Sequence, residues 1–322
     1  MLKIVLISCL LFVSAGCQKK ASHPLNEWMS KSDKIKVLST IAQIGDLVKE
    51  VGGERVDNWT LIQGALDPHA YELVKGDGEK LERADLIFYN GLGLEHGASL
   101  SSWLHSSIKA HAVSEEILKR APEKIIYKGK AIDPHVWMDI SLWEYSVDSI
   151  TAELSKKDPE GAPYYHLRAA VLKDRMEKVH RELYEYTHQI SSERRYLVTS
   201  HDAFHYFTRA YLSESQAELN WEERVSAPEG LAPDGQISSS DIQNMLQVIR
   251  THRINVLFPE SNVSRDSIRK IVLSGKELGI SLGICEEPLY GDAMEGEDLS
   301  YLDMMRHNVD VVVNNLKKYE RD

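Results

Sequence analysis

Short apolar runs alternate with stretches of helical periodicity along most of the chain. Strands are short, whereas amphipathic helices repeat an apolar residue every three or four positions, so spacing separates the two kinds of segment. The apolar runs predict strands at residues 35–39, 56–62, 85–89, 196–199, 254–258 and 280–285. The periodic stretches predict helices at residues 41–52, 70–83, 238–250, 264–278 and 302–316. This alternation indicates parallel sheets with flanking helices, and therefore an α/β fold.

One periodic stretch, residues 163–192, is longer than a typical globular helix. Its charged residues lie between apolar ones, which predicts a single amphipathic helix of about 45 Å. The residues expected on its inner face are Leu167, Ala170, Val171, Met176, Val179, Leu183, Tyr186 and Ile190. A rigid helix of this length suits a connection between two lobes. We therefore expect a first α/β lobe at residues 33–160, an interlobe helix at 161–194 and a second α/β lobe at 195–322.

The first 17 residues have the pattern of a bacterial export signal. Lys3 precedes an apolar run at residues 4–13, which is too short to span a bilayer as a mature helix. The small residues before Cys17 resemble a lipobox, in which Cys17 would be acylated, although Ser14 stands where an aliphatic residue is usual. Residues 18–32 are polar and predict a flexible tether. Ordinary cleavage after Ala15 or Gly16, without a lipid, is the alternative.

The overall composition describes a folded protein with an acidic surface. Of the 322 residues, 43% are hydrophobic and 27% are charged, which suffices for two ordinary cores. The formal net charge of −11 argues against a nucleic-acid partner, because phosphate binding needs a basic face. Of three cysteines, Cys9 leaves with the signal and Cys17 takes the lipid. Cys285 is then the remaining thiol, and its apolar surroundings predict a buried side chain rather than a soft metal ligand.

The tripeptide Asp-Pro-His occurs twice, at residues 67–69 and 133–135. Proline fixes its own φ and favours extended geometry in the residue before it, so each copy predicts a stiff turn that presents an imidazole. The first copy follows a predicted strand, and ligands of open parallel sheets bind beyond the carboxyl ends of strands. Since imidazole is a common ligand of transition metals, we interpret His69 and His135 as parts of one metal site.

A third imidazole and a carboxylate complete the expected site. His201 follows the apolar run at residues 196–199, and Asp292 follows the last predicted strand. Three histidines and one carboxylate suit a divalent transition ion. Glu260 also stands at a strand end and is either a ligand or an acceptor that orients a histidine. Asp67 and Asp133 are either similar acceptors or turn formers.

The remaining histidines are interpreted differently. His205 and Asp202 compete with His201 for the third position, because they lie close to it in sequence. Seven others, which stand in helical or polar stretches and are interpreted as solvated or structural, are His105, His111, His166, His180, His188, His252 and His307. The nearby aromatic residues Phe204, Tyr206, Phe207, Trp137 and Trp143 are interpreted as core.

The order of these motifs resembles a known family. DPHAYE, DPHVW, a long helix, SHDAFHYF, FPES, PLYGDAM and a final helix with MMRHN follow one another along almost the whole mature chain. This order is similar to that of the metal-specific substrate-binding lipoproteins of bacterial ABC importers. The resemblance implies two α/β lobes on a rigid interlobe helix, with zinc, manganese or iron held between them. It aligns His69, His135, His201 and Asp292 with the family's ligands.

Two departures leave the metal open. Zinc-dedicated members often carry a long loop rich in histidine and acid between the first two ligands, whereas residues 101–130 contain only His105 and His111. Manganese-dedicated members often have a glutamate at the third position, where this chain has His201. The donor set is therefore compatible with zinc, manganese or iron.

The function expected from these features is binding and delivery, without catalysis. One ion would be captured outside the cytoplasm, in the periplasm or at the outer face of the cytoplasmic membrane. The resemblance implies an ABC permease and its ATPase as partners, a membrane anchor through Cys17, and a monomer. Two alternatives are a zinc hydrolase, with water at an open metal position, and a surface adhesin whose metal is structural. No HExxH motif supports the hydrolase.

Overall fold

The computed structural model describes residues 24–318 apart from 216, 234–236, 295 and 297–298. The predicted signal peptide, Cys17 and the first part of the predicted tether lie outside these residues. Among the described helices, none has both the length and the apolar character needed to cross a bilayer.

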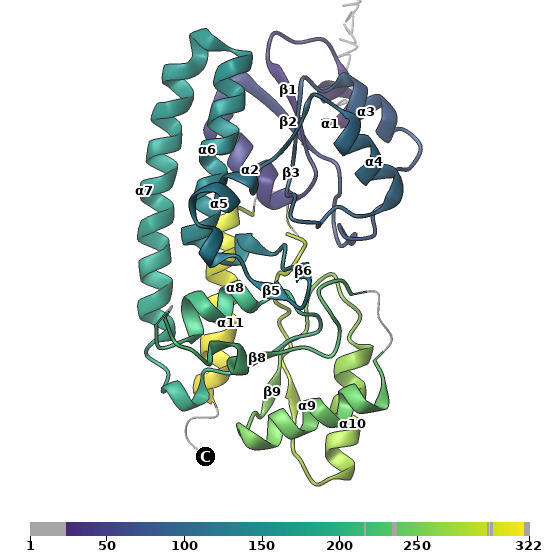
Figure 1. Cartoon of the computed structure of the whole chain (residues 1–322), viewed down its shortest axis with the longest axis vertical. Helices are drawn as coiled ribbons and strands as arrows, with labels where there is room; N and C mark the ends of the chain where they lie inside the picture. Colours follow the sequence, from purple (N-terminus) through teal and green to yellow (C-terminus); the bar gives the residue numbers. More distant parts are fainter. Residues whose placement is uncertain (1–23, 216, 234–236, 295, 297–298, 319–322) are drawn as a thin grey trace, which may run out of the picture.

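A four-stranded parallel sheet forms the first half of the structure, in the order β2-β1-β3-β4 (Figure 1). The strands are β1 (Ile35–Ser39), β2 (Val56–Thr60), β3 (Leu86–Tyr89) and β4 (Ala110–Ala112). Alternate residues enter two different cores, since Val37 packs in one cluster and its neighbour Leu38 in another. The helices of this half are α2 (Ala42–Gly52), α3 (Asp77–Arg83), α4 (Ala98–Ser106) and α5 (Glu115–Arg120). The α/β fold expected from the alternating pattern is confirmed.

The predicted tether is wrong in its second half. Residues Pro24–Met29 form the short helix α1, and the Trp28 side chain is buried. The indole Nε1 of Trp28 donates to the Asp57 carbonyl at 2.9 Å, and its ring lies 6.5 Å from that of Trp59. A tryptophan within a polar segment can bury its large apolar surface against the sheet, which fixes this part of the chain.

The helix predicted at residues 70–83 begins only at Asp77. Gly76, with a φ of 96°, adopts a left-handed conformation that a helix does not continue through. The Asp77 carboxylate accepts from the Val74 amide at 2.9 Å and the Tyr71 hydroxyl at 2.8 Å. These contacts stabilise a turn in which residues 70–76 carry the chain away from the first Asp-Pro-His motif.

Two long helices lie side by side along the molecule, α6 (Ile140–Lys157) and α7 (Ala162–Thr187) (Figure 1). The first has no counterpart among the predicted elements. The second ends earlier than the predicted residue 192, and its 26 residues span about 39 Å. Its buried face agrees with the predicted one at Met176, Val179 and Leu183 but differs near the start of the helix, where Leu167 and Val171 are 66% and 61% exposed. The residues that face the core are Tyr165, Ala169, Leu172, Met176, Val179, Leu183 and Thr187.

The second half contains short pairs of parallel strands. β7 (Leu197–Val198) pairs with β8 (Val225–Ser226), and β9 (Val256–Leu257) pairs with β10 (Gly283–Ile284). The Phe258 amide donates to the Val198 carbonyl at 2.8 Å, which joins the two pairs. β7, β9 and β10 stand at predicted places but are shorter than predicted, whereas β8 was not predicted. Helices α9 (Ser239–Thr251) and α10 (Asp266–Glu277) pack against them.

The remaining elements connect the two halves. The hairpin of β5 (Tyr127–Lys128) and β6 (Ala131–Ile132) leads into the second Asp-Pro-His motif, and α8 (His205–Phe207) follows His201. The last helix, α11 (Tyr301–Lys318), returns to pack against α7 and α2 (Figure 1). The residue boundaries of the two lobes stay a prediction.

The buried face of α7 can be tested with a matched pair of substitutions. Leu172→Ala removes a side chain that is 2% exposed and should lower the free energy of unfolding by about 2–5 kcal/mol. Leu167→Ala, on the exposed face, should change it by no more than about 0.5 kcal/mol. Denaturant unfolding of both variants measures this. Equal losses, or a larger loss for Leu167→Ala, would contradict the observed orientation.

Candidate metal centre

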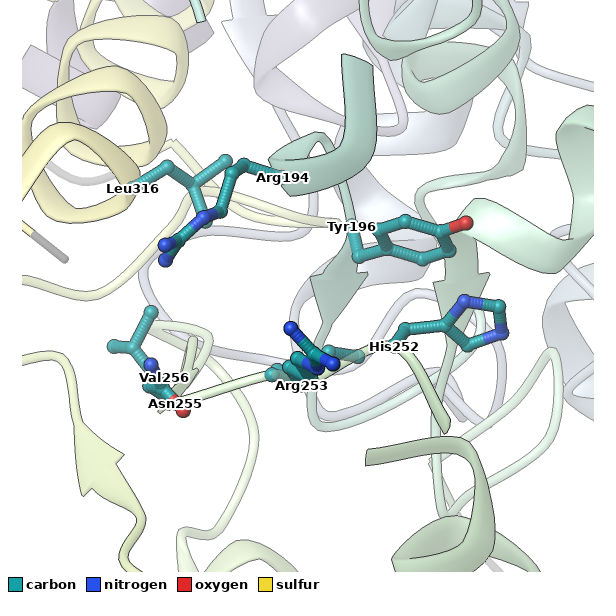
Figure 2. Close-up of a pocket in the computed structure, with 8 residues that line it drawn as sticks. Arg194, Tyr196, His252, Arg253, Asn255, Val256 and Leu316 are labelled. Atoms are coloured by element: carbon teal, nitrogen blue, oxygen red, sulfur yellow. The ribbon is translucent and has the colours of Figure 1, made fainter. Parts of the chain in front are cut away.

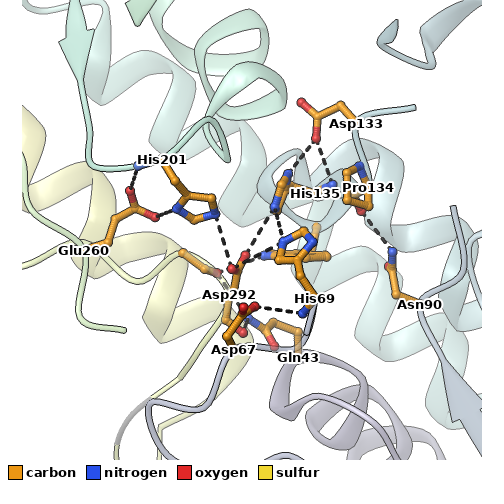
Figure 3. A network of polar contacts seen from close by, with 12 residues as sticks. Gln43, Asp67, His69, Asn90, Asp133, Pro134, His135, His201, Glu260 and Asp292 are labelled. Atoms are coloured by element: carbon orange, nitrogen blue, oxygen red, sulfur yellow. Dashed lines mark hydrogen bonds and ion pairs between the residues drawn. The ribbon is translucent and has the colours of Figure 1, made fainter. Parts of the chain in front are cut away.

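Four side chains from distant parts of the sequence meet in the interior (Figure 3). His69, His135, His201 and Asp292 each direct one ligand atom to a common point, and these atoms all lie within 4.8 Å of one another. All four residues are buried. Among the described residues, this is the one group of three or more histidine, cysteine or acidic side chains that could hold an ion.

The distances within the cluster are short and involve both carboxylate oxygens. The Nε2 atoms of His69 and His135 lie 3.2 Å apart. Oδ1 of Asp292 is 3.3 Å from His135 Nε2, whereas Oδ2 is 3.3 Å from His201 Nε2 and 3.6 Å from His69 Nε2. Three imidazole nitrogens and a carboxylate therefore surround one position at which a cation would contact all of them.

Loops that follow strands bring these residues together. His69 lies beyond β2, His135 follows β6, and His201 lies beyond β7. Asp292 comes shortly after Leu289, which bridges to Glu260 beyond β9. The expected position of the site beyond strand ends is confirmed, although whether these residues bind metal stays a prediction.

The two Asp-Pro-His motifs share one turn geometry but differ in a second contact. Asp67 Oδ1 accepts from the His69 amide at 2.8 Å, and Asp133 Oδ1 accepts from the His135 amide at 3.0 Å. Asp133 Oδ1 also lies 2.7 Å from Nδ1 of the His135 ring. Asp133 therefore orients its imidazole, whereas the contact of Asp67 with His69 is to the backbone. The sequence left both roles open for both residues.

Glu260 orients the third imidazole. Its Oε2 lies 2.6 Å from His201 Nδ1, so that Nε2 of the ring points at the cluster. Its Oε1 accepts from the amides of Ser200 and His201 at 3.0 and 2.9 Å. A Cβ on Gly291 would lie 2.4 Å from Glu260 Oε2, which explains glycine next to Asp292. Of the two roles considered for Glu260, the geometry favours the acceptor behind a ligand.

The loop at residues 90–97 donates hydrogen bonds to both Asp-Pro-His motifs. The amides of His96 and Gly97 donate to the His69 carbonyl at 3.3 and 3.0 Å. Asn90 Nδ2 donates to the Pro134 carbonyl at 3.0 Å (Figure 3). These contacts hold the backbones of the two motifs in place, and no sequence pattern singled out Asn90.

The three imidazoles differ in the direction in which their pKa values are shifted. Burial lowers the pKa of His69 to about 3, against the attraction of Asp292. Burial also acts to lower the pKa of His135, but Asp133 and Asp292 outweigh it and raise the pKa to about 9. The pKa of His201 is likewise raised, because Glu260 and Asp292 overcome desolvation. Burial acts to raise the pKa of Asp292, yet His201 and His135 hold it well below its usual value.

His205, a competitor of His201 in the sequence, lies outside the four. It is buried, with Nδ1 3.3 Å from Asp133 Oδ2 and Nε2 3.4 Å from Asp202 Oδ1. It therefore supports Asp133, which in turn orients His135. The sequence identified His205 only as a rival ligand.

The other histidines in the described part of the chain do not join the cluster. One of them, His252, lines a small cavity of about 20 Å³ together with Tyr196 and Arg253, and its ring stacks on that of Tyr196 at 4.2 Å (Figure 2). This volume holds about one water molecule. Cys285 is buried, as its apolar surroundings predict.

Two further polar side chains near the site were not expected to have a role there. Gln43 and Trp137 donate to main-chain carbonyls of the segment that carries Asp292. Trp137 was expected only as core, which its burial confirms. Their partners lie more than 150 residues away in sequence, so local pattern could not reveal these contacts.

Known proteins are similar to this chain in sequence and in fold. Residues 37–315 match the family described as ZnuA, zinc-uptake complex component A, periplasmic. The metal-binding protein YtgA of Chlamydia trachomatis is 35% identical over 309 residues, which cover 95% of this chain and 94% of YtgA. The crystal structure of Fe(III)-bound YtgA matches with a TM-score of 0.83 over 88% of this chain and 98% of that one.

Two other relatives are named for different metals. The manganese-binding lipoprotein MntA of Bacillus subtilis is 33% identical over 297 residues, covering 89% of this chain and 92% of MntA. The periplasmic zinc-binding protein TroA of Treponema pallidum matches in structure with a TM-score of 0.79 at 31% identity, over 88% of this chain and 99% of that one. Since these matches run along almost the whole described chain, the protein belongs to the ZnuA family of periplasmic metal-binding proteins, together with YtgA, MntA and TroA.

Proposed function

We propose that this chain is the extracytoplasmic substrate-binding component of an ABC importer for a divalent transition metal. One ion is captured by His69, His135, His201 and Asp292 and passed to a membrane permease with its ATPase. The observation that carries this proposal is the convergence of four buried ligand atoms within 4.8 Å of one another. Family membership supports delivery to a permease as the purpose of capture.

Binding without catalysis fits this geometry better than hydrolysis. A zinc hydrolase keeps one metal position open for water. Here both oxygens of Asp292 face imidazole nitrogens, so that the carboxylate closes the fourth position or chelates the ion.

The charge balance of the site suits a divalent cation. The Asp292 carboxylate neutralises half of the charge of the ion, and Asp133 and Glu260 stand directly behind two of the imidazoles. Buried charge is tolerated when it is compensated in this way. Zinc binds more tightly than manganese or ferrous iron at almost any nitrogen site, so affinity alone does not reveal which metal a protein carries. Zinc, manganese and iron therefore all remain candidate cargo.

The proposed location follows from the sequence and the family. The lipobox-like segment at Cys17 supports a lipid anchor on a monomer outside the cytoplasm, and the similar proteins MntA and PsaA are named lipoproteins.

The ligand role can be tested with two neighbouring histidines. His69→Ala should lower metal affinity by more than about 100-fold. This loss exceeds the loss that is usual when a residue that only hydrogen-bonds to a metal ligand is replaced. His96→Ala is the matched control, since its exposed ring lies 5.6 Å from that of His69 and outside the cluster. Competition with a chelator under zinc, manganese or ferrous iron measures both.

Wild-type protein should bind one ion per chain, and His69→Ala should keep its circular dichroism spectrum. Unchanged affinity of His69→Ala would contradict the proposed site. Unfolding of this variant would instead indicate a structural metal. Metal-dependent turnover of ester, phosphate or peptide substrates would favour the hydrolase.

Metal affinity should rise with pH between about 6 and 9. An imidazolium cannot bind metal, so the ion must displace a proton from His135, whose pKa lies at about 9, and from His201, whose pKa is also raised. For each proton that the ion displaces, the metal affinity should increase by at most about tenfold per pH unit. Chelator competition at pH 6, 7 and 8 measures the slope. An affinity that is constant over this range would contradict these protonation states.

A further inference from the structure

The segment that carries Asp292 is held by a residue from the opposite end of the sequence. Gln43, on α2, is fully buried, and its Nε2 lies 3.3 Å from the Gly291 carbonyl and 3.1 Å from the Asp292 carbonyl. Both acceptors are main-chain atoms, so this contact fixes the backbone of the ligand and leaves its carboxylate free for the ion. Figure 3 shows Gln43 beside Asp292.

A second donor acts on the same carbonyl. The indole Nε1 of Trp137 donates to the Gly291 carbonyl at 3.1 Å. Trp137 is itself fixed, because it is fully buried and its own carbonyl accepts from the Tyr301 hydroxyl at 2.6 Å. The Gly291 carbonyl thus accepts hydrogen bonds from two side chains, and both of these residues precede α7 in the sequence.

The helix α2 also holds the chain where it enters α11. Asp46 stands three residues after Gln43, on the same face of α2, and its carboxylate accepts from the Tyr301 amide at 2.9 Å. Gln43 and Asp46 therefore contact the chain at residues 291–292 and 301. Ala293, Met294, Gly296 and Leu299, which lie between these points, line a cavity of about 990 Å³ together with residues of α2 and β2.

We propose that Gln43 is a positioning residue that sets Asp292 against the three imidazoles and thereby governs the rate of metal release. This inference rests on the proposed function. The second lobe supplies Asp292, whereas α2 belongs to the first half of the fold, so the Gln43 contact ties the two halves together at the ligand itself. Parting them leaves two buried carbonyls without these donors and withdraws the carboxylate in one movement. Loss of the amide should therefore loosen Asp292 while all four ligands remain present.

Gln43→Leu removes the amide and keeps a buried side chain of similar size. Zinc-loaded protein mixed with excess chelator should release the ion about 10–100-fold faster than wild type, with one ion still bound per chain. Gln63→Leu is the matched control, because Gln63 is exposed and its side-chain amide donates to the Thr60 carbonyl at 3.0 Å rather than to the segment that carries Asp292. This control should release zinc at the wild-type rate.

A double-mutant cycle separates positioning from general stability. In the Asp292→Asn background, Gln43→Leu should have little further effect on zinc affinity, because both changes act through one ligand. A full additive effect in that background, or a wild-type release rate for Gln43→Leu, would overturn the inference.

Trp137→Phe provides a second test if Gln43→Leu does not fold. It removes one donor to the Gly291 carbonyl and keeps an aromatic ring, so release should again be faster, and an unchanged rate would overturn the inference. Absence of zinc binding by the wild-type protein would overturn the proposed function itself. Normal wild-type binding with unchanged release from both variants would overturn only the role of Gln43 and Trp137.

Discussion

The structure depends on the enclosure of three imidazoles and a carboxylate around one point. Nitrogen and oxygen atoms that lie 3.2–3.6 Å apart are kept out of water there, where uncompensated polar groups are costly. A cation at this point would satisfy all of them at once. The carboxylates around His135 and His201 raise the pKa of each imidazole. Under the proposed function, an ion would therefore displace protons from these two side chains with little change in buried charge.

The two halves of the fold contribute unequally to this arrangement. His69 and His135 stand on stiff proline turns, and the loop at residues 90–97 fixes both of them. His201 depends on Glu260, and the backbone at Asp292 is held from α2 across the molecule. The first pair of ligands is therefore built into one half, whereas the position of Asp292 depends on how the two halves meet. Under the proposed function, this difference would allow movement between the halves to capture and release the ion.

The sequence predicted those features that local pattern controls. Repeated Asp-Pro-His turns and apolar runs ending at candidate ligands led to the four converging residues, and β1 has the predicted bounds. Features decided by tertiary contacts were missed or wrong. Leu167 and Val171 fit a helical stripe as well as the buried residues of α7 do, so spacing alone could not select the face. The burial of Trp28 and the contact of Gln43 with Asp292 depend on partners distant in sequence.

Anomalous diffraction from crystals of the metal-loaded protein would show directly whether one ion lies among the four side chains. An ion at the proposed site should give a single strong peak within about 2.0–2.3 Å of one nitrogen each from His69, His135 and His201 and of the Asp292 carboxylate. A peak elsewhere in the molecule, or an ion that contacts only one or two of these residues, would contradict it.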